Sequence, residues 1–208
     1  MIRRLLRILG CGACTAALLL GACASDTPKP PPPEASADPV VLVLAWWEAR
    51  NAFDYNAMAR LMTGEALQNP FGSPEEVAAA RALDRVVTPL DCEVGTENAS
   101  LGTFVSCDVS VSDIIVAAAG VTSRNLNRAT FRVRDGAIIA VPVWIPSSQV
   151  AEEAIEAWAR VYRPLEYQRS CPLGIAGQSS VDGATCARFI ARNQAGWSGR
   201  VAALGLDS

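Results

Sequence analysis

The stretch "ATFRVRDGAIIAVPVW", residues 129 to 144, decides the fold of this chain. Apolar and polar residues alternate from Ala129 to Arg134, which is the period of a strand with one buried face. Asp135-Gly136 is a favoured two-residue hairpin turn. The run from Ile138 to Ile145 is apolar on both phases of the alternation, which predicts a central strand covered on both faces. The stretch therefore predicts an antiparallel hairpin.

A second hairpin is predicted upstream of this stretch. Residues 86–94 and 103–111 both have strand patterns, and a segment that contains glycine, asparagine and serine separates them. A turn at residues 98–101 places Cys92 opposite Cys107. Directly opposed Cβ atoms lie about 4.5–5.5 Å apart, which is a little wide of disulfide geometry but within easy adjustment.

Four cysteines lie within residues 39–208, and their even number predicts disulfides in an exported protein. Three pairings are open. The hairpin favours Cys92 with Cys107, which leaves Cys171 to staple a glycine-rich loop to the start of a helix through Cys186. A loop of this size stabilises by about 3 kcal/mol. The alternative, a four-cysteine metal site, usually has a close C-x-x-C spacing that these four cysteines lack, so we expect no metal.

Helices are expected both before and after the predicted strands in the chain. Asp38-Pro39 supplies a capping carboxylate and a first-turn proline, and Ser73-Pro74 followed by two glutamates combines a capping box with the same signal. Pro164 ends a helix with a clear apolar stripe, and Gly196 follows the last one. The predicted helices span residues 40–51, 55–62, 74–85, 149–163 and 184–193.

The N-terminus has the pattern of an export signal. Three arginines precede an apolar stretch of about 13 residues, which is too short for a transmembrane helix of roughly 20. Leu20-Gly21-Ala22-Cys23 resembles the lipobox of bacterial lipoproteins, which implies cleavage after residue 22 and acylation of Cys23. The alternative is an ordinary secretory signal with a chance cysteine. Acylation predicts a protein anchored in a cell-envelope membrane, on its extracytoplasmic side, without spanning it.

Residues 24–38 follow as a proline-rich polar tract, which predicts an extended tether of at most roughly 45 Å. The rest, residues 39–208, has the size of one ordinary domain. Without the three leader arginines, the 21 acidic residues exceed the basic ones by about six, so we expect no nucleic-acid partner. The sequence has no histidine, which excludes a Ser-His-Asp triad, a Cys-His dyad and histidine metal sites. We expect no cofactor.

Two stretches resemble the nuclear transport factor 2-like superfamily, which includes the SnoaL-like cyclases. "AWWEARNAFDYNAMARLMTGEALQNP", residues 45 to 70, is similar to the opening helices of that group, with matches at Phe53-Asp54-Tyr55 and Leu61. Residues 129–144 are similar to its "F-x-V-x-D-G-x-I" hairpin. The resemblance covers about residues 40 to 145. It implies an α+β fold, with N-terminal helices packed in a curved antiparallel sheet (a cystatin-like cone) and extra C-terminal helices.

Members of that superfamily enclose a cavity, and its enzymes place polar side chains inside. Asp113 is in phase with Val109 and Val111, so it is a candidate general base. The alternative is that the strand has ended and Asp113 begins a turn. An apolar cavity has six candidate lining residues, which serve equally well as plain core: Trp46, Trp47, Phe53, Met58, Phe131 and Trp144.

The sequence therefore predicts a membrane-anchored lipoprotein that is a non-catalytic binding module. Its expected partners are the membrane, through the N-terminal lipid, and either a small apolar ligand or an envelope protein. The alternative is a SnoaL-like isomerase, cyclase or hydrolase that uses Asp113 in an apolar cavity. A carboxylate that is hydrogen-bonded inside a closed apolar cavity would favour the enzyme. A filled core with an exposed apolar patch would favour the binding module.

Overall fold

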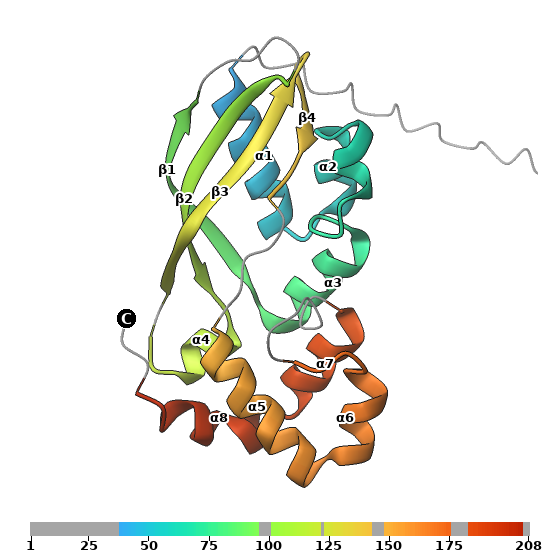
Figure 1. The fold of residues 1–208 in the computed structure, drawn as a ribbon, viewed down its shortest axis with the longest axis vertical. Helices are drawn as coiled ribbons and strands as arrows, with labels where there is room; N and C mark the ends of the chain where they lie inside the picture. Colours follow the sequence, from blue (N-terminus) through green and yellow to red (C-terminus); the bar gives the residue numbers. More distant parts are fainter. Residues whose placement is uncertain (1–37, 96–100, 122, 143–147, 176–182, 206–208) are drawn as a thin grey trace, which may run out of the picture. The chain divides into compact units, whose positions relative to one another are not determined.

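The computed structural model describes residues 38–95, 101–121, 123–142, 148–175 and 183–205. The leader, Cys23, the tether, Trp144 and most of the predicted turn at 98–101 lie outside these residues. The described part is a mixed α+β structure with a four-stranded antiparallel sheet, in the order β1-β2-β3-β4, and eight α-helices (Figure 1).

The two predicted hairpins form the sheet. Its strands are β1 (Val86–Val94), β2 (Thr103–Ser112), β3 (Arg124–Arg134) and β4 (Ala137–Ala140). Cys92 lies opposite Cys107, and the disulfide between them confirms the predicted register. Asp135 and Gly136 have φ of 53° and 72°, the left-handed backbone that a two-residue turn between antiparallel strands requires. Sequence pattern and turn chemistry thus agree across the sheet.

Strand β4 corrects one prediction, because it is a short edge strand and not a central one. Its edge is covered by the segment Leu61–Thr63. The N–H of Ile138 donates to the carbonyl of Leu61 at 2.9 Å, and the N–H of Thr63 donates to the carbonyl of Ile138 at 2.9 Å. Ile138 is therefore fully buried although β4 pairs with a strand, β3, on one side only. The segment Leu61–Thr63, which covers the edge of β4, explains why the sequence is apolar at Ile138.

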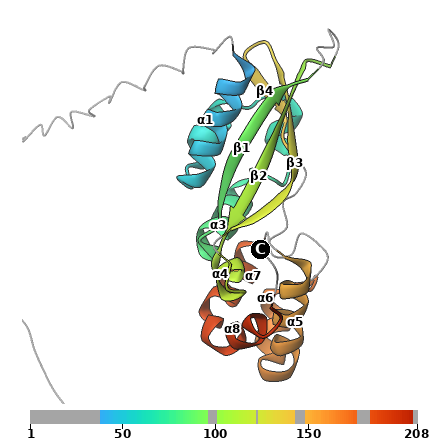
Figure 2. The same cartoon turned by 90° about the vertical axis from the view of Figure 1, so that its left-hand side faces the viewer.

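One face of the sheet packs against the first helix, α1 (Pro39–Asn51), as Figures 1 and 2 show. The carboxylate of Asp38 caps this helix by accepting from the N–H of Val40. At its other end, the side-chain amide of Asn51 donates to the carbonyl of Val87 at 2.7 Å and accepts from its N–H at 3.0 Å. Helix α2 (Tyr55–Arg60) and the 3-10 helix η1 (Gly64–Gln68) complete this first core.

The remaining helices form a second core. They are α3 (Pro74–Leu83), α4 (Ile114–Ala118), α5 (Gln149–Tyr162), α6 (Pro164–Ser170), α7 (Ala184–Arg192) and α8 (Gln194–Ala202). Helix α3 joins the two cores, since Val77 packs in the first while Ala79 and Leu83 pack in the second. Because α3 contributes side chains to both cores, it joins the sheet and the helices into one folded unit.

Three of these helices, α4, α6 and α8, are absent from the sequence prediction. Pro164 ends α5 as predicted, but it also occupies the first turn of α6. Gly196 does not follow the last helix, because it lies inside α8. A Cβ at Gly196 would lie 2.4 Å from Cζ2 of Trp158. The glycine is thus required by the close approach of α8 to the Trp158 ring and not by a helix end.

The outer face and the β1 edge of the sheet are polar or irregular. On the outer face, the hydroxyls of Ser106 and Thr130 lie 3.0 Å apart, and Arg128 forms an exposed ion pair with Asp108. At the edge, β1 carries Pro89, and a shift of register follows it before Asp91. A proline and a bulge both interrupt the row of backbone groups that another strand would need.

Candidate functional site

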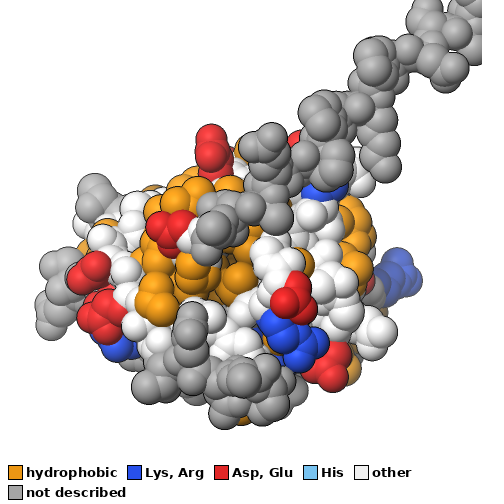
Figure 3. Space-filling model, turned by 90° about the horizontal axis from the view of Figure 1, so that it is seen from above, with side chains coloured by type: hydrophobic (Ala, Val, Ile, Leu, Met, Phe, Trp, Pro, Cys, Tyr) orange, Lys and Arg blue, Asp and Glu red, His pale blue; other side chains and the backbone are white. Residues whose placement is uncertain are grey.

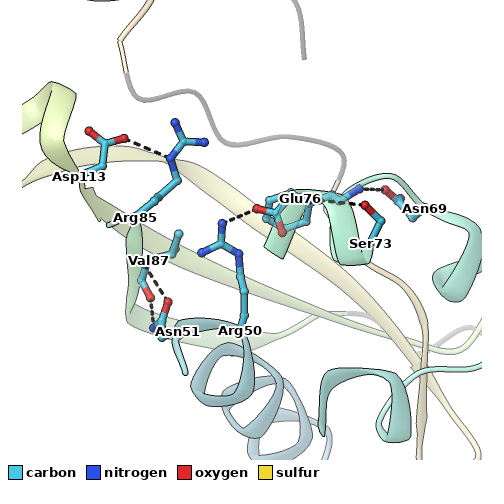
Figure 4. A network of polar contacts seen from close by, with 9 residues as sticks. Arg50, Asn51, Asn69, Ser73, Glu76, Arg85, Val87 and Asp113 are labelled. Carbon is cyan, nitrogen blue, oxygen red and sulfur yellow. Dashed lines mark hydrogen bonds and ion pairs between the residues drawn. The ribbon is translucent and has the colours of Figure 1, made fainter. Parts of the chain in front are cut away.

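Two buried ion pairs link the elements around the centre of the fold (Figure 4). Arg50 of α1 donates to Oε1 of Glu76 in α3 at 2.6 Å, and both side chains are almost fully buried. The Arg50 guanidinium also lies over the Phe71 ring, at 5.3 Å from its centroid. Glu76 is in turn held by Ser73, whose hydroxyl accepts from the Glu76 N–H and caps α3. The pair fixes α1 against the start of α3.

Asp113, the candidate general base, is the residue that caps α4. Its Oδ1 accepts from the N–H groups of Ile115 and Val116 at 2.9 and 2.8 Å, and its Oδ2 accepts from Nε of Arg85 at 3.1 Å. The structure thus ends β2 at Ser112, as in the alternative in which Asp113 begins a turn. Three donors engage the carboxylate, and it holds the end of β2 to the start of β1.

The six aromatic and apolar candidates do not surround a common cavity in the described residues. Trp46, Trp47, Met58 and Phe131 are fully buried in the first core. The rings of Trp46 and Phe131 have centroids 5.3 Å apart, and those of Trp47 and Phe131 are 5.5 Å apart. Phe53 is half-buried against the Arg81 guanidinium, and Trp144 lies outside the described residues. These contacts are those of a filled core.

A pocket of about 430 Å³ lies elsewhere, between the starts of α3 and α7 and the end of α6. The sequence analysis did not identify it. Its walls come from three segments, of which the first is far from the other two in the chain: Pro70, Ser73, Glu75 and Glu76; Arg169, Ser170, Cys171, Pro172 and Leu173; and Gly183, Thr185 and Cys186.

The second disulfide, Cys171–Cys186, forms part of the pocket wall and confirms the predicted pairing. It joins the residue that follows α6 to the first turn of α7. Both cysteines are buried, so the covalent link is shielded by the packing around it. The separation of these two walls is therefore fixed by a covalent bond as well as by packing.

The carboxylate of Glu156 on α5 holds the segment that continues from this wall. Its Oε2 accepts from the N–H of Ile175 at 2.8 Å, and its Oε1 pairs with Arg160. Burial raises the pKa of the Tyr167 phenol, and the hydrogen bond with Glu156 raises it further. Gly174 has φ of 91°, and a Cβ there would lie 3.4 Å from this carboxylate. One acidic side chain thus connects α5, α6 and the end of the pocket wall.

The pocket is suited to binding rather than to acid–base chemistry. Its walls are mainly apolar, with Pro70, Pro172 and Leu173 among them, and Leu173 is 78% exposed. Glu75 and Arg169 are exposed charges of opposite sign on different walls. In the part of the chain that the structure describes, no cluster of three or more cysteine, aspartate or glutamate side chains is arranged to hold a metal ion. An apolar group with a small polar end fits these walls.

The spacing of Cys171 and Cys186 was the one signal in the sequence that pointed to this region. No family model matches the chain, and the comparison with curated proteins gives no match. The two disulfides indicate an oxidising, extracytoplasmic environment. Of the helices that the structure describes, none has the length and apolar character needed to cross a membrane.

Proposed function

We propose that this chain is a lipid-anchored cell-envelope protein whose folded part is a non-catalytic binding module. The pocket between α3, α6 and α7 takes a small apolar ligand, or an apolar side chain of an envelope protein. The observation that carries the proposal is the mainly apolar pocket whose walls are joined by the Cys171–Cys186 disulfide. A preformed apolar site with few polar groups is the usual form of a small-ligand site.

The anchor part of the proposal is supported by the sequence around Cys23 and by the disulfides. The lipobox-like Leu20-Gly21-Ala22-Cys23 follows a short apolar leader, and the disulfides belong in an oxidising compartment. Two or three acyl chains on Cys23 would hold the chain firmly on a membrane, because two hydrophobic signals are enough for stable anchoring.

The non-catalytic part is supported by what the buried carboxylates do. Asp113 is engaged by Arg85 and by two backbone N–H groups, and Glu76 is paired with Arg50. A general base needs a free position for the proton that it abstracts. Both oxygens of Asp113 accept hydrogen bonds, so it lacks such a position. Among the described residues, Oε2 of Glu76 has no hydrogen-bond partner, but its Oε1 joins α3 to α1 through Arg50. The placement of both carboxylates between secondary-structure elements therefore favours a structural role.

The proposal includes a relationship of the sheet and α1 to the nuclear transport factor 2-like cone. It is supported by the order of helix before sheet, by the Asp135-Gly136 hairpin and by the cover of one sheet face by α1. An experimentally determined structure that superposes on such a cone over residues 40 to 142 tests this relationship, and a flat sheet with no curl around α1 contradicts it.

The pocket is tested by native mass spectrometry of the protein purified from its own membrane. Thr185→Trp places an indole in the pocket from the first turn of α7, where Thr185 is exposed. We expect the wild-type chain to carry acyl mass and an additional bound mass, and we expect Thr185→Trp to lose only the additional mass. The indole fills the space that the ligand occupies.

The matched control is Gln168→Trp, an exposed position on α6 outside the pocket lining. This variant should retain the bound mass. A wild-type chain with no bound mass, or equal retention in both tryptophan variants, contradicts binding in this pocket. A chain without acyl mass contradicts the proposed lipid anchor but does not change the test of the pocket.

A further inference from the structure

The hairpin end of β1 and β2 lies level with the first turn of α1 (Figures 1 and 2). The Asn51–Val87 hydrogen bonds align the last residue of α1 with the start of β1. From there α1 runs back for 13 residues, which is about 20 Å. The same distance along β1 reaches only to about Glu93, at about 3.3 Å per residue. Val94 and the start of β2 therefore lie near the start of α1.

Apolar side chains are exposed at this hairpin end of the sheet. Val94 is opposite the fully buried Val105, on the face that α1 covers elsewhere, yet it is 51% exposed. Leu101 before β2, and Val41 and Leu44 in the first turns of α1, are also at least 41% exposed. We call these four residues the apolar end. Figure 3, which views the molecule from this side, shows hydrophobic side chains gathered there.

The chain between the folded part and Cys23 enters at the apolar end. Asp38, which caps α1, is the residue at which the tether joins the fold. Charged residues near this end have both signs, with Asp38, Asp135 and Glu93 against Arg134. The three acidic residues outnumber the one basic residue, so this end is not attracted to an anionic surface, for which clusters of basic residues are needed.

We propose that the apolar end rests on the surface of a bilayer with zwitterionic phospholipid head groups and so sets the orientation of the folded part. The inference rests on the anchor in the proposed function. Acyl chains on Cys23 supply the affinity, since two chains already hold a protein firmly. The tether of at most roughly 45 Å permits the contact but does not impose it. The exposed valines and leucines supply the contact itself.

This orientation has a consequence for the pocket. Helix α3 directly precedes β1, and α4 directly follows β2, so the second core joins the sheet at the Val86 and Ser112 ends of these strands. The apolar end is at the opposite ends, Val94 and Thr103. With the apolar end on lipid, the pocket at the starts of α3 and α7 faces away from the membrane.

The test uses a tryptophan reporter and lipids with brominated acyl chains, which quench only nearby indoles. The acylated protein is purified from its membrane and reconstituted in phosphatidylcholine vesicles. Among the described residues, the native tryptophans are buried, so emission is read as a difference from wild type. We expect Val94→Trp to lose emission in brominated vesicles. Val161→Trp on α5, which replaces a residue that is also exposed, should lose none.

A second substitution checks that the contact is hydrophobic. Leu44→Asp in the Val94→Trp background should restore the emission, because a carboxylate is costly to place in hydrocarbon. Leu165→Asp on α6 is the matched control and should leave the quenching unchanged, since Leu165 is exposed outside the apolar end. Recovery with both aspartates, or with neither, contradicts the proposed contact.

The remaining outcomes separate this inference from the anchor. An acylated chain in which neither reporter is quenched keeps the anchor and overturns the bilayer contact; a second copy or a protein partner that covers Val94 gives this result. Quenching of both reporters overturns a defined orientation. A chain without acyl mass whose Val94→Trp is still quenched overturns the anchor and supports the contact.

Discussion

At the scale of single residues, three polar side chains bind backbone groups and so connect elements that are distant in sequence. Asn51 pairs with both backbone groups of Val87, Asp113 caps α4 while it binds Arg85, and Glu156 binds the N–H of Ile175. Each satisfies a backbone group that would otherwise be costly to bury. The cap of α4 by Asp113 is local, but the pairings of Asn51 with Val87, Asp113 with Arg85 and Glu156 with Ile175 do not follow from local sequence, because the partners come from other elements.

Gly196 in α8 gives a prediction at this scale. We expect Gly196→Ala to lower the free energy of unfolding by about 1–3 kcal/mol, because the added methyl group overlaps the ring of Trp158. Gly199→Ala in the same helix is the matched control, since a Cβ at that position would meet no other part of the fold within 4 Å. It should raise the free energy of unfolding by about 0.5–1 kcal/mol. Urea unfolding with intact disulfides measures both, and equal changes of the same sign would contradict the packing argument.

At the scale of elements, the two disulfides serve different structures although they close loops of the same size. Both have a sequence separation of 15. Cys92–Cys107 joins strands that the β1–β2 ladder already pairs, whereas Cys171–Cys186 joins the end of α6 to α7. The first therefore reinforces a sheet, and the second holds a pocket wall.

This difference predicts equal losses of stability but unequal local effects. Replacing either pair by alanines should lower the free energy of unfolding by about 3 kcal/mol, since the loop closed in the unfolded chain is the same size. Only the Cys171→Ala, Cys186→Ala variant should show faster amide hydrogen exchange at residues 173–175. Exchange measured by mass spectrometry checks this, and unchanged protection there would show that packing alone holds the wall.

The sequence was sufficient for those elements whose signals are local. The alternation in β1 and β2 with Cys92 opposite Cys107, and the Asp135-Gly136 turn, gave the observed register. It was insufficient where cover came from elsewhere. Ile138 has the pattern of a central strand because the segment 61–63 covers it, and Gly196 has the pattern of a helix end because it meets Trp158. Both predictions were wrong because a tertiary contact requires the same residue type that a local signal would use.

At the scale of the whole molecule, the pocket could not be predicted because its walls are assembled from segments about 100 residues apart. Ser73, Arg169 and Thr185 meet only when α3 packs against α7. The aromatic residues near the N-terminus instead fill the first core. Both cores contain packed aromatic side chains, and the open pocket lies beside the second core.

The pH dependence of stability belongs to this scale. Burial and the hydrogen bond with Glu156 raise the pKa of Tyr167 above the ordinary value of 10.0. The contribution of the protonated Tyr167 phenol to the free energy of unfolding is therefore fully present below about pH 10. It is lost as the pH rises through the higher pKa of the folded state. We expect the melting temperature of the wild type to fall more steeply than that of Tyr167→Phe between about pH 9 and pH 12. Parallel curves would contradict a raised pKa.

The irregular edge of β1 would matter most if many copies of the protein share one membrane. Proteins confined to two dimensions collide far more often than the same number in solution, and an open sheet invites them to polymerise strand by strand. Pro89 lacks a backbone N–H, and the extra residue beside it shifts the register of the pairing between β1 and β2. If the proposed anchor holds the protein on a membrane, this edge opposes strand-by-strand association of crowded copies.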